Sequence, residues 1–305
     1  MKNNQLMIYG AYGYAGELMV REAVAQRLRP IIAGRDAEKL KPIATELSLE
    51  CRAFGVRNTG SNLQDISVLL NCAGPFSATA EPLARACLAQ QIHYLDITGE
   101  IDIFRKCHAL DEEARQQNVL ILPGAGTDIV PTDCLAAMLK EKLPVATRID
   151  LALSFGTNPS IGTVNTMIES FGKGGLIREG GMLKVVSNAF QMRKIPFQNK
   201  PQWAMTIPWG DVFTSGISTG VPDGAVYMAM PRMSIYMIRL TNPVKGILNT
   251  QFGQKITKRL AGWLMKKGPD AKALEAGRGQ FWGEAEAPDG EKLEMTMSTP
   301  NVYAL

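Results

Sequence analysis

Near its N-terminus the chain reads Gln5-Leu-Met-Ile-Tyr-Gly-Ala-Tyr-Gly-Tyr-Ala-Gly16. The apolar run 6–9 predicts a buried strand, and a helical pattern follows over 17–26. The glycines between them predict a tight turn, because glycine adopts backbone conformations that other residues avoid. Backbone N–H groups at such a helix start have no intrahelical partner and lie at the positive end of the helix dipole. They therefore suit a phosphate.

The spacing of these glycines is G-x-x-G-x-x-G, whereas the dinucleotide-binding fingerprint is G-x-G-x-x-G. We expect Gly10 to turn the chain, Gly13 to let a pyrophosphate approach the backbone, and Gly16 to let the helix pack on the strand. A turn without any ligand would also carry such a triplet. The position of this one, between the first strand and the first helix, favours nucleotide binding.

The second predicted strand, Arg29-Pro-Ile-Ile-Ala-Gly-Arg35, indicates which nucleotide binds. Enzymes that prefer NAD usually place an acid at this strand end to hold the ribose 2′-hydroxyl, and here the place is taken by Gly34. Arg35 follows, and its guanidinium suits a 2′-phosphate, so NADP is favoured. For Asp36 we favour an N-cap on a helix over 37–47.

The chain has 305 residues, enough for two domains, and 46% of them are apolar. Its net charge of +4 is too small to indicate a nucleic-acid partner, so none is expected. The five cysteines are scattered without C-x-x-C pairs, which favours free thiols over disulfides or a metal site. No apolar stretch is long enough to span a bilayer and no signal peptide is expected, so we predict a cytoplasmic protein.

Strands and helices alternate over the first half of the chain, which predicts an α/β fold with a doubly wound parallel sheet. We expect this domain to span 1–145 and a second, α+β domain for the substrate to span 146–305. The predicted strands are 6–10, 29–34, 50–54, 67–72, 93–97, 119–123, 148–155, 226–230 and 293–298. The predicted helices are 17–26, 37–47, 78–91, 102–117, 131–143 and a piece within 162–181.

Ligands of such sheets bind beyond the carboxyl ends of the strands, so the segments that follow the strands are the candidate site. Asn71-Cys-Ala-Gly-Pro-Phe76 is expected to lie along the ribose and nicotinamide of the cofactor. Asp96-Ile-Thr-Gly-Glu100 and Pro123-Gly-Ala-Gly-Thr-Asp-Ile-Val-Pro131 follow the next two strands.

The predicted catalytic residues, Glu100 and Asp128, come from these loops. Each has an alternative structural role, Glu100 as a helix-start acid and Asp128 as a helix cap. No tyrosine is followed by a lysine four positions later, which argues against the mechanism of short-chain dehydrogenases. A proton from water is a further alternative. The other candidate acids are Asp96, Thr98, Thr127, Glu169 and Tyr227.

The segment 243–268 holds six basic residues and no acid, and its apolar residues recur at helical spacing. It could make a peripheral contact with a membrane surface or dock on an acidic carrier protein. We favour the alternative, a helix that packs its apolar face on its own domain and leaves its basic face in solvent.

The chain resembles the saccharopine dehydrogenase-like oxidoreductases, most closely the branch that includes trans-acting enoyl reductases. The resemblance rests on Gly10-Ala-Tyr-Gly-Tyr-Ala-Gly16, Ala33-Gly-Arg-Asp36, Asn71-Cys-Ala-Gly-Pro-Phe76, Tyr94-Leu-Asp-Ile-Thr-Gly-Glu100, Gly124-Ala-Gly-Thr-Asp-Ile-Val-Pro131, Pro208-Trp-Gly-Asp211 and Gly279-Gln-Phe-Trp-Gly-Glu-Ala285. It implies an NADP-binding Rossmann domain with an inserted α/β substrate domain. It further implies diphosphate contacts from Gly10, Tyr12, Gly13, Tyr14, Ala15 and Gly16, a 2′-phosphate contact from Arg35, and ribose contacts from Ala73, Gly74 and Pro75.

We therefore expect an oxidoreductase that passes hydride from NADPH to an electron-poor double bond, such as that of an enoyl thioester. One alternative is a saccharopine-type imine reductase acting on an amino acid–keto acid adduct, which would need converging arginines. Another is a non-catalytic NADP-binding sensor. The arginines available in the second domain show no cluster in their spacing: Arg148, Arg178, Arg193, Arg232 and Arg239.

For partners we expect a small-molecule or carrier-bound substrate and no metal, and we leave a homodimer open. Relatives continue past a motif like Thr299-Pro-Asn-Val-Tyr303 into a C-terminal helix that returns to the first domain. This chain ends at Leu305, which predicts a truncated or divergent C-terminus.

Overall fold

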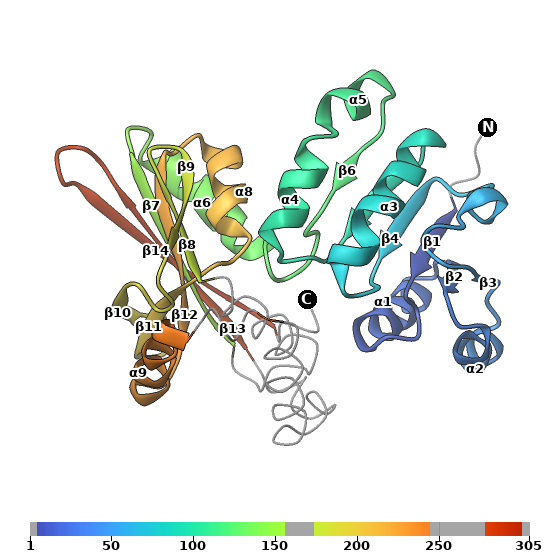
Figure 1. Ribbon diagram of the computed structural model, residues 1–305, viewed down its shortest axis with the longest axis horizontal. Helices are drawn as coiled ribbons and strands as arrows, with labels where there is room; N and C mark the ends of the chain where they lie inside the picture. The colour runs from blue at the N-terminus through green and yellow to red at the C-terminus, as the bar shows by residue number, and fades with distance from the viewer. Residues whose placement is uncertain (1–4, 156–173, 245–249, 251–277, 301–305) are drawn as a thin grey trace. The chain divides into compact units, whose positions relative to one another are not determined.

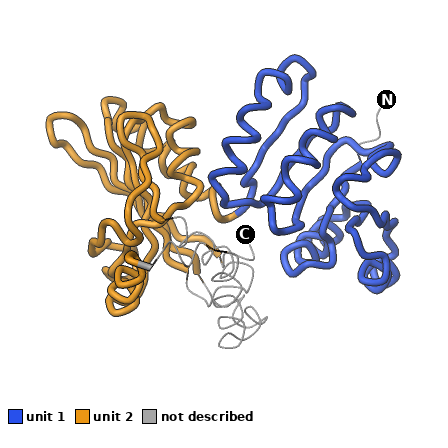
Figure 2. Tube along the Cα trace, in the orientation of Figure 1, with its two compact units in different colours: residues 1–126 blue, residues 127–305 orange. Residues whose placement is uncertain are grey.

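The computed structural model describes residues 5–155, 174–244, 250 and 278–300. The chain forms two compact units, unit 1 over 1–126 and unit 2 over 127–305 (Figures 1 and 2). The basic segment 243–268 and the helical piece predicted within 162–181 lie largely outside the described residues. Among the residues that are described, no helix combines the length and apolar character needed to cross a membrane.

Unit 1 is built on a six-stranded parallel sheet in the order β3-β2-β1-β4-β5-β6, which confirms the predicted doubly wound α/β fold. The strand order reverses between β1 and β4, and the carboxyl ends of strands at such a reversal form the usual ligand crevice. The strands are β1 (Leu6–Tyr9), β2 (Ile31–Gly34), β3 (Cys51–Ala53), β4 (Val68–Asn71), β5 (His93–Asp96) and β6 (Ile121–Leu122).

Helices cover both faces of this sheet. Side chains of β1 alternate between the faces, so Ile8 packs with residues of α1 and α2, whereas Met7 and Tyr9 pack with residues of α3, α4 and α5. The helices are α1 (Tyr14–Ala25), α2 (Ala37–Leu47), α3 (Phe76–Ala89), α4 (Ile101–His108), α5 (Asp111–Gln116) and the 3-10 helix η1 (Gly60–Leu63).

The single helix predicted over 102–117 is wrong, because the structure has two helices there. α4 ends at His108, and Leu110 is buried in the core before α5 begins. Three acids, Asp111 to Glu113, form the first turn of α5, where the helix dipole favours negative charge. The sequence pattern is helical throughout, but the burial of Leu110 and the acidic first turn mark the start of a second helix.

Unit 2 contains a mixed eight-stranded sheet whose main path runs β10-β11-β12-β7-β13-β14. β7 lies between β12, which runs parallel to it, and β13, which runs antiparallel. The hairpin of β8 and β9 joins the sheet through β12. The strands are β7 (Arg148–Phe155), β8 (Gly175–Glu179), β9 (Met182–Val186), β10 (Met192–Pro196), β11 (Pro201–Ile207), β12 (Asp223–Ala229), β13 (Gly279–Glu286) and β14 (Lys292–Thr299).

The described helices of unit 2 are α6 (Val130–Lys142), α8 (Asp211–Thr219), α9 (Arg232–Leu240) and the 3-10 helix η2 (Asn242–Val244). α6 packs on β13, and a Cβ at Gly283 would lie only 2.6 Å from Leu139 Cδ1. The strand–helix alternation assigns α6 to the first domain and puts the boundary near residue 145. Because α6 packs on the sheet of unit 2, the compact units divide at Gly126 instead.

Candidate functional site

The turn between β1 and α1 is built by glycine. Gly10 has a φ of +86°, a left-handed conformation that favours glycine, and its N–H donates to Ala33 O at 2.7 Å. The N–H of Gly13 then donates back to the Gly10 carbonyl at 2.9 Å. These bonds close the turn directly beyond the carboxyl end of the strand.

Two of the three glycines leave no space for a side chain. A Cβ at Gly16 would lie 2.2 Å from the Gly10 carbonyl oxygen, and a Cβ at Gly10 would lie 2.7 Å from the backbone nitrogen of Ala73. At Gly13 the nearest atom would be 3.2 Å away, which is tight but less severe. The first turn of α1 therefore packs on the glycine turn itself, and this turn lies against the loop that follows β4.

The glycine turn has the features that bind a diphosphate. Gly13 is the N-cap of α1, and no side chain caps this helix. The N–H groups of its first turn, such as those of Ala15 and Gly16, have no intrahelical carbonyl to bond and can donate to a ligand. The residues present therefore fit a dinucleotide, and the residues predicted to hold its diphosphate are Gly10, Tyr12, Gly13, Tyr14, Ala15 and Gly16.

An aromatic ring and two cations gather at the end of β2. The Tyr12 ring lies against Gly34, where a Cβ would be 2.6 Å from the ring, and Lys39 Nζ lies 5.7 Å from the ring centroid. Arg35 directly follows Gly34 and is exposed, and its charge counteracts the rise in the pKa of Tyr9 that burial and Tyr12 cause. Two cations at the end of β2, one of them over an aromatic ring, suit a phosphorylated adenosine ribose.

The structure confirms the role predicted for Asp36. Its Oδ1 accepts the N–H groups of Glu38 at 3.1 Å and of Lys39 at 3.3 Å, so it caps α2. Sequence reasoning did not find Lys39, because only the first turn of α2 brings its side chain back over the Tyr12 ring.

A buried hydrogen-bond network joins the loops that follow β4, β5 and β6. Asn71 Nδ2 donates to the Tyr94 hydroxyl at 3.1 Å, which donates to Asp96 Oδ2 at 2.8 Å. Asp96 Oδ1 accepts the N–H groups of Thr98 at 3.0 Å and of Gly124 at 2.9 Å. Because Asn71, Tyr94 and Asp96 are fully buried, these bonds fix three loops relative to one another.

This network makes Asp96 a brace and not an acid for catalysis. Burial raises the pKa of Asp96, while the N–H groups of Thr98 and Gly124 and the Tyr94 hydroxyl counteract the rise. Both carboxylate oxygens accept bonds from the protein itself, which leaves no access for a substrate.

The same network positions the predicted ribose loop, Ala73 to Pro75. Asn71 Oδ1 accepts the Ala73 N–H at 3.0 Å, and Thr79 Oγ1 donates to the Ala73 carbonyl at 2.6 Å. This loop also carries the atoms that approach Gly10. The structure thus brings the two glycine-containing loops together.

Glu100 lies at the N-cap of α4 and is half-buried. Its N–H donates to Thr98 Oγ1 at 3.1 Å, and its carbonyl accepts the N–H groups of Ile103 and Phe104. Its backbone therefore begins the helix, which is the structural role weighed against catalysis. The catalytic role of its carboxylate stays a prediction.

Asp128 lies in unit 2, in the segment that precedes α6. Burial raises the pKa of Asp128 to about 6, so its carboxyl group can hold or release a proton near neutral pH. Its carbonyl accepts the indole N–H of Trp209 at 2.7 Å. The alternative role as a helix cap is wrong, because Ile129 occupies the cap position and no side chain caps α6.

The segment that contains Trp209 makes a second contact with the start of α6, besides the bond to Asp128. Thr132 Oγ1 donates to Asp211 Oδ1 at 2.7 Å, and Asp211 is fully buried. Burial raises the pKa of Asp211 well above its ordinary value, and Asp133 and Asp128 add to the rise. Two motifs far apart in the sequence, 124–131 and 208–211, therefore meet around Asp128.

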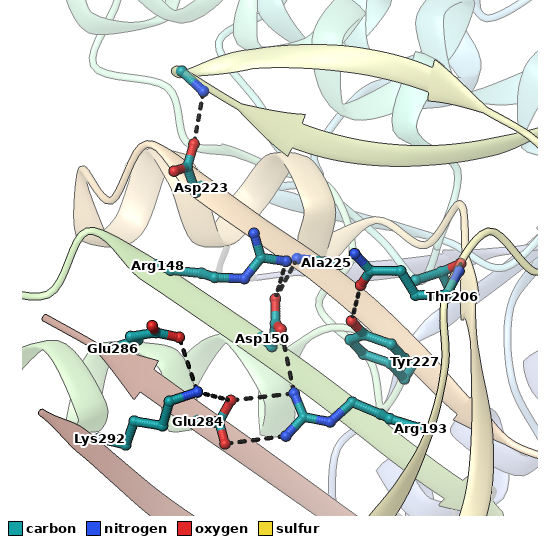
Figure 3. Close-up of polar contacts among 12 residues, drawn as sticks. Arg148, Asp150, Arg193, Thr206, Asp223, Ala225, Tyr227, Glu284, Glu286 and Lys292 are labelled. Atoms are coloured by element: carbon teal, nitrogen blue, oxygen red, sulfur yellow. Dashed lines mark hydrogen bonds and ion pairs between the residues drawn. The ribbon is translucent and has the colours of Figure 1, made fainter. Parts of the chain in front are cut away.

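The face of the unit 2 sheet opposite α6 carries a network of charges (Figure 3). Arg193 forms a two-pronged bond with Glu284, at 3.1 and 3.0 Å, and lies 3.4 Å from Asp150. Arg148 lies 3.0 Å from the other oxygen of Asp150, and Lys292 lies 3.7 Å from Glu284. Burial raises the pKa of Asp150, and the two arginines counteract the rise.

The arginines of unit 2 therefore converge more than their spacing suggests, but each is already engaged. Arg148 and Arg193 meet at Asp150 although they come from different strands. The other three bond to backbone carbonyls or stack on an aromatic ring: Arg178, Arg239 and Arg232.

The remaining candidate acids have other roles or lie elsewhere. Tyr227 is fully buried, donates its hydroxyl hydrogen bond to Gln191, and has a pKa that burial raises above its ordinary value. Thr127 is buried before α6, and Glu169 lies outside the described residues.

Residues 6–122 match the family model of the saccharopine dehydrogenase NADP-binding domain. The chain is 26% identical to a saccharopine dehydrogenase-like oxidoreductase of Rattus norvegicus, over 66% of this chain and 53% of the relative. A Homo sapiens protein of the same name is 25% identical over the same shares. The chain thus spans about half the length of these curated relatives.

A Mycobacterium tuberculosis relative named as a trans-acting enoyl reductase is 28% identical, over 60% of this chain and 44% of that protein. Among solved structures, apo saccharopine dehydrogenase (L-Glu forming) of Saccharomyces cerevisiae has a TM-score of 0.62 at 9% identity. The match covers 99% of this chain and 87% of that one. This likeness shows the fold, and the sequence matches confirm the predicted resemblance.

Proposed function

We propose that this chain, whose residues 6–122 match the model of the saccharopine dehydrogenase NADP-binding domain, is an NADP-dependent oxidoreductase. The observation that carries the proposal is the glycine turn, where Gly10 and Gly16 exclude any side chain and α1 begins without a cap. When bound, the cofactor supplies hydride chemistry.

The protein's own residues hold and orient this cofactor. The N–H groups at the start of α1 receive the diphosphate, and Arg35 and Lys39 receive the 2′-phosphate. The buried bonds of Asn71 and Asp96 keep the loops after β4, β5 and β6 fixed, so the ribose side of the site does not reorganise on binding.

We propose an electron-poor double bond, such as that of an enoyl thioester, as the hydride acceptor. The name of the Mycobacterium tuberculosis relative supports this choice. The saccharopine-type alternative needs free arginines for a substrate with several carboxylates. Arg148 and Arg193 are already paired with carboxylates of the protein, which disfavours that alternative.

Reduction also delivers a proton to the acceptor, and we propose that Asp128 supplies it. Its pKa of about 6 lets the carboxyl group hold or release a proton near neutral pH. The indole N–H of Trp209 donates to the backbone carbonyl of Asp128. This bond holds the backbone that carries the carboxyl group.

Titrating the protein with NADPH and NADH by fluorescence tests the cofactor assignment. We expect NADPH to bind at least about tenfold more tightly, because only NADPH presents a 2′-phosphate to Arg35. Failure to bind NADPH would overturn the proposal at its base.

Following NADPH oxidation with panels of enoyl thioesters and of amino acid–keto acid mixtures then tests the substrate class. Turnover with enoyl thioesters alone is expected. Turnover only with the imine-forming mixtures would replace that assignment by the saccharopine-type one. Tight NADPH binding without turnover on either panel would instead favour a sensor.

A further inference from the structure

α9 is apolar on two opposite faces. Ile235 is fully buried on the inner face, where α9 packs beside β11 (Figure 1). Four apolar side chains lie on the outer face at the spacing i, i+3, i+4 and i+7, which places them in one row along a helix. This outer stripe consists of Met233, Tyr236, Met237 and Leu240, with exposed fractions of 72%, 38%, 59% and 71%.

The stripe is held on a fixed element. Arg232 lies 5.0 Å from the Trp203 ring and donates to the Tyr236 hydroxyl at 3.0 Å. At the other end Arg239 Nε donates to the Ala189 carbonyl at 2.9 Å, and Asn242 Nδ2 donates to Asn188 O at 3.1 Å. The helix that carries the stripe is therefore already ordered. Little conformational entropy is lost when a partner covers its outer face.

The bond to Ala189 brings a further apolar side chain to this end of α9. Phe190 follows Ala189 and is 45% exposed, and its carbonyl lies 3.5 Å from Arg239 Nη2. Phenylalanine is among the apolar residues that interfacial segments bury at the boundary between headgroups and acyl chains.

Two observations select the partner. A standard protein interface takes about 20 residues from each partner, whereas the stripe offers four, so it is too small to hold a second copy of the chain by itself. α9 itself carries two arginines, Arg232 and Arg239, and no acid. Positive charge beside an exposed apolar helix face suits an anionic lipid surface.

We propose that the stripe of α9 docks unit 2 on the surface of an anionic lipid layer, with its apolar side chains at the headgroup boundary and its arginines beside the phosphates. This inference does not depend on the reductase proposal. It concerns α9, whereas the peripheral contact considered from the sequence concerned 243–268, which lies largely outside the described residues.

The experiment is flotation of the full chain with vesicles of phosphatidylcholine, with and without a minority of phosphatidylglycerol. The test variant combines Met233→Ser, Met237→Ser and Leu240→Ser, all exposed positions whose loss should not unfold the protein. The matched control combines Met182→Ser, Val185→Ser and Ile217→Ser, which are 74%, 65% and 57% exposed on β9 and α8.

We expect the native chain to float with the anionic vesicles and to do so less as salt is raised, because screening weakens the attraction. The test variant should bind these vesicles at least about tenfold more weakly, and the control variant as the native chain does. NADPH affinity should be unchanged in both variants, which separates this test from that of the proposed function.

Equal flotation of the test variant and the native chain would overturn the proposal, and so would absence of binding to anionic vesicles. Light scattering after size-exclusion chromatography completes the test. A native dimer that becomes a monomer in the test variant, with no vesicle binding, would assign the stripe to a second copy of the chain.

Discussion

The two units handle buried polar groups in different ways. In unit 1 the buried carboxylate of Asp96 is satisfied by backbone N–H groups and by a neighbouring hydroxyl. In unit 2 the buried carboxylates of Asp150 and Glu284 pair with arginine side chains, and Arg193 of β10 bridges the two carboxylates. The first arrangement fixes loops at the ends of strands, where a cofactor binds, whereas the second ties strands of a sheet together.

The strongest test of this difference is Gly16→Ala. In unit 1 the first turn of α1 packs directly on the backbone of the glycine turn. The new Cβ would meet the Gly10 carbonyl oxygen at 2.2 Å. We expect the free energy of unfolding to fall by about 3 kcal/mol and NADPH affinity to fall at least about 100-fold. Denaturant unfolding and fluorescence titration measure the two effects.

Gly55→Ala is the control, since no atom lies within 4 Å of a Cβ at that position and its φ is not left-handed. It should leave NADPH affinity unchanged. Native affinity in Gly16→Ala would show that the glycine turn does not hold the cofactor.

Asp128→Asn tests whether a carboxyl group of unit 2 takes part in chemistry as well as in structure. Loss of a proton donor should lower kcat at least about 100-fold on the best enoyl thioester, with NADPH affinity unchanged. The exposed Asp111→Asn is the control and should keep full activity. Equal activity of the native chain and Asp128→Asn would leave water as the proton source.

The same substitution has a pH signature in stability. The pKa of Asp128 is raised to about 6, so between about pH 4 and pH 6 the folded state binds a proton that the unfolded state has lost. Native stability should therefore fall as the pH rises through this window, by up to about 3 kcal/mol. Asp128→Asn should lack this fall and be the more stable protein at pH 7.

Glu284→Gln sharpens the comparison on the side of unit 2. It removes the charge that faces Arg193 and should lower the free energy of unfolding by about 2 kcal/mol. The loss is not larger because Arg193 still pairs with Asp150 and is partly exposed to solvent. Its partners lower the pKa of Glu284 although burial opposes them, so this stabilisation should be present above about pH 4.5 and lost on acidification.

The control for this substitution is Glu179→Gln, which breaks an ion pair with Lys184 between two exposed side chains. Its effect should stay within about 0.5 kcal/mol at every pH. If Glu284→Gln also changed the free energy of unfolding by no more than about 0.5 kcal/mol, the charge network of the sheet would not stabilise unit 2.

The smallest expected effect is that of Arg35→Ala, which removes one of two cations at the end of β2. NADPH should bind about tenfold more weakly and NADH less than about twofold, because Lys39 remains and NADH lacks the 2′-phosphate. Lys41→Ala, on the exposed side of α2, should change neither affinity. Equal losses for both cofactors in Arg35→Ala would refute the role of Arg35.

Unit 1 could be predicted from the sequence because its signals are local. The glycine turn, the cap at Asp36 and the loops after β4 and β5 each depend on residues a few positions apart. The split between α4 and α5 could not be predicted, because it depends on the burial of Leu110 in the completed core.

Unit 2 was predictable only in outline, because its pairings span long stretches of chain. β7 was predicted as a strand, but nothing near it shows that its neighbours are β12 and β13. Arg148 lies two residues from Asp150 on β7, but Arg193 reaches Asp150 only through the strand order β10-β11-β12-β7. The contact between Trp209 and Asp128 also joins distant parts of the chain. The sequence therefore showed only two separate motifs and not that they meet.

The position of β7 in its sheet also sets an order of events during synthesis. Every strand of the unit 1 sheet has left the ribosome once residue 122 has emerged, so this unit can fold while translation continues. β7 must wait for its partner on one side until residue 286 has been added. The nascent chain would then carry a finished nucleotide-binding half while the other half is still without its central pairing, a stage at which cofactor already in the cell could stabilise the part that is complete.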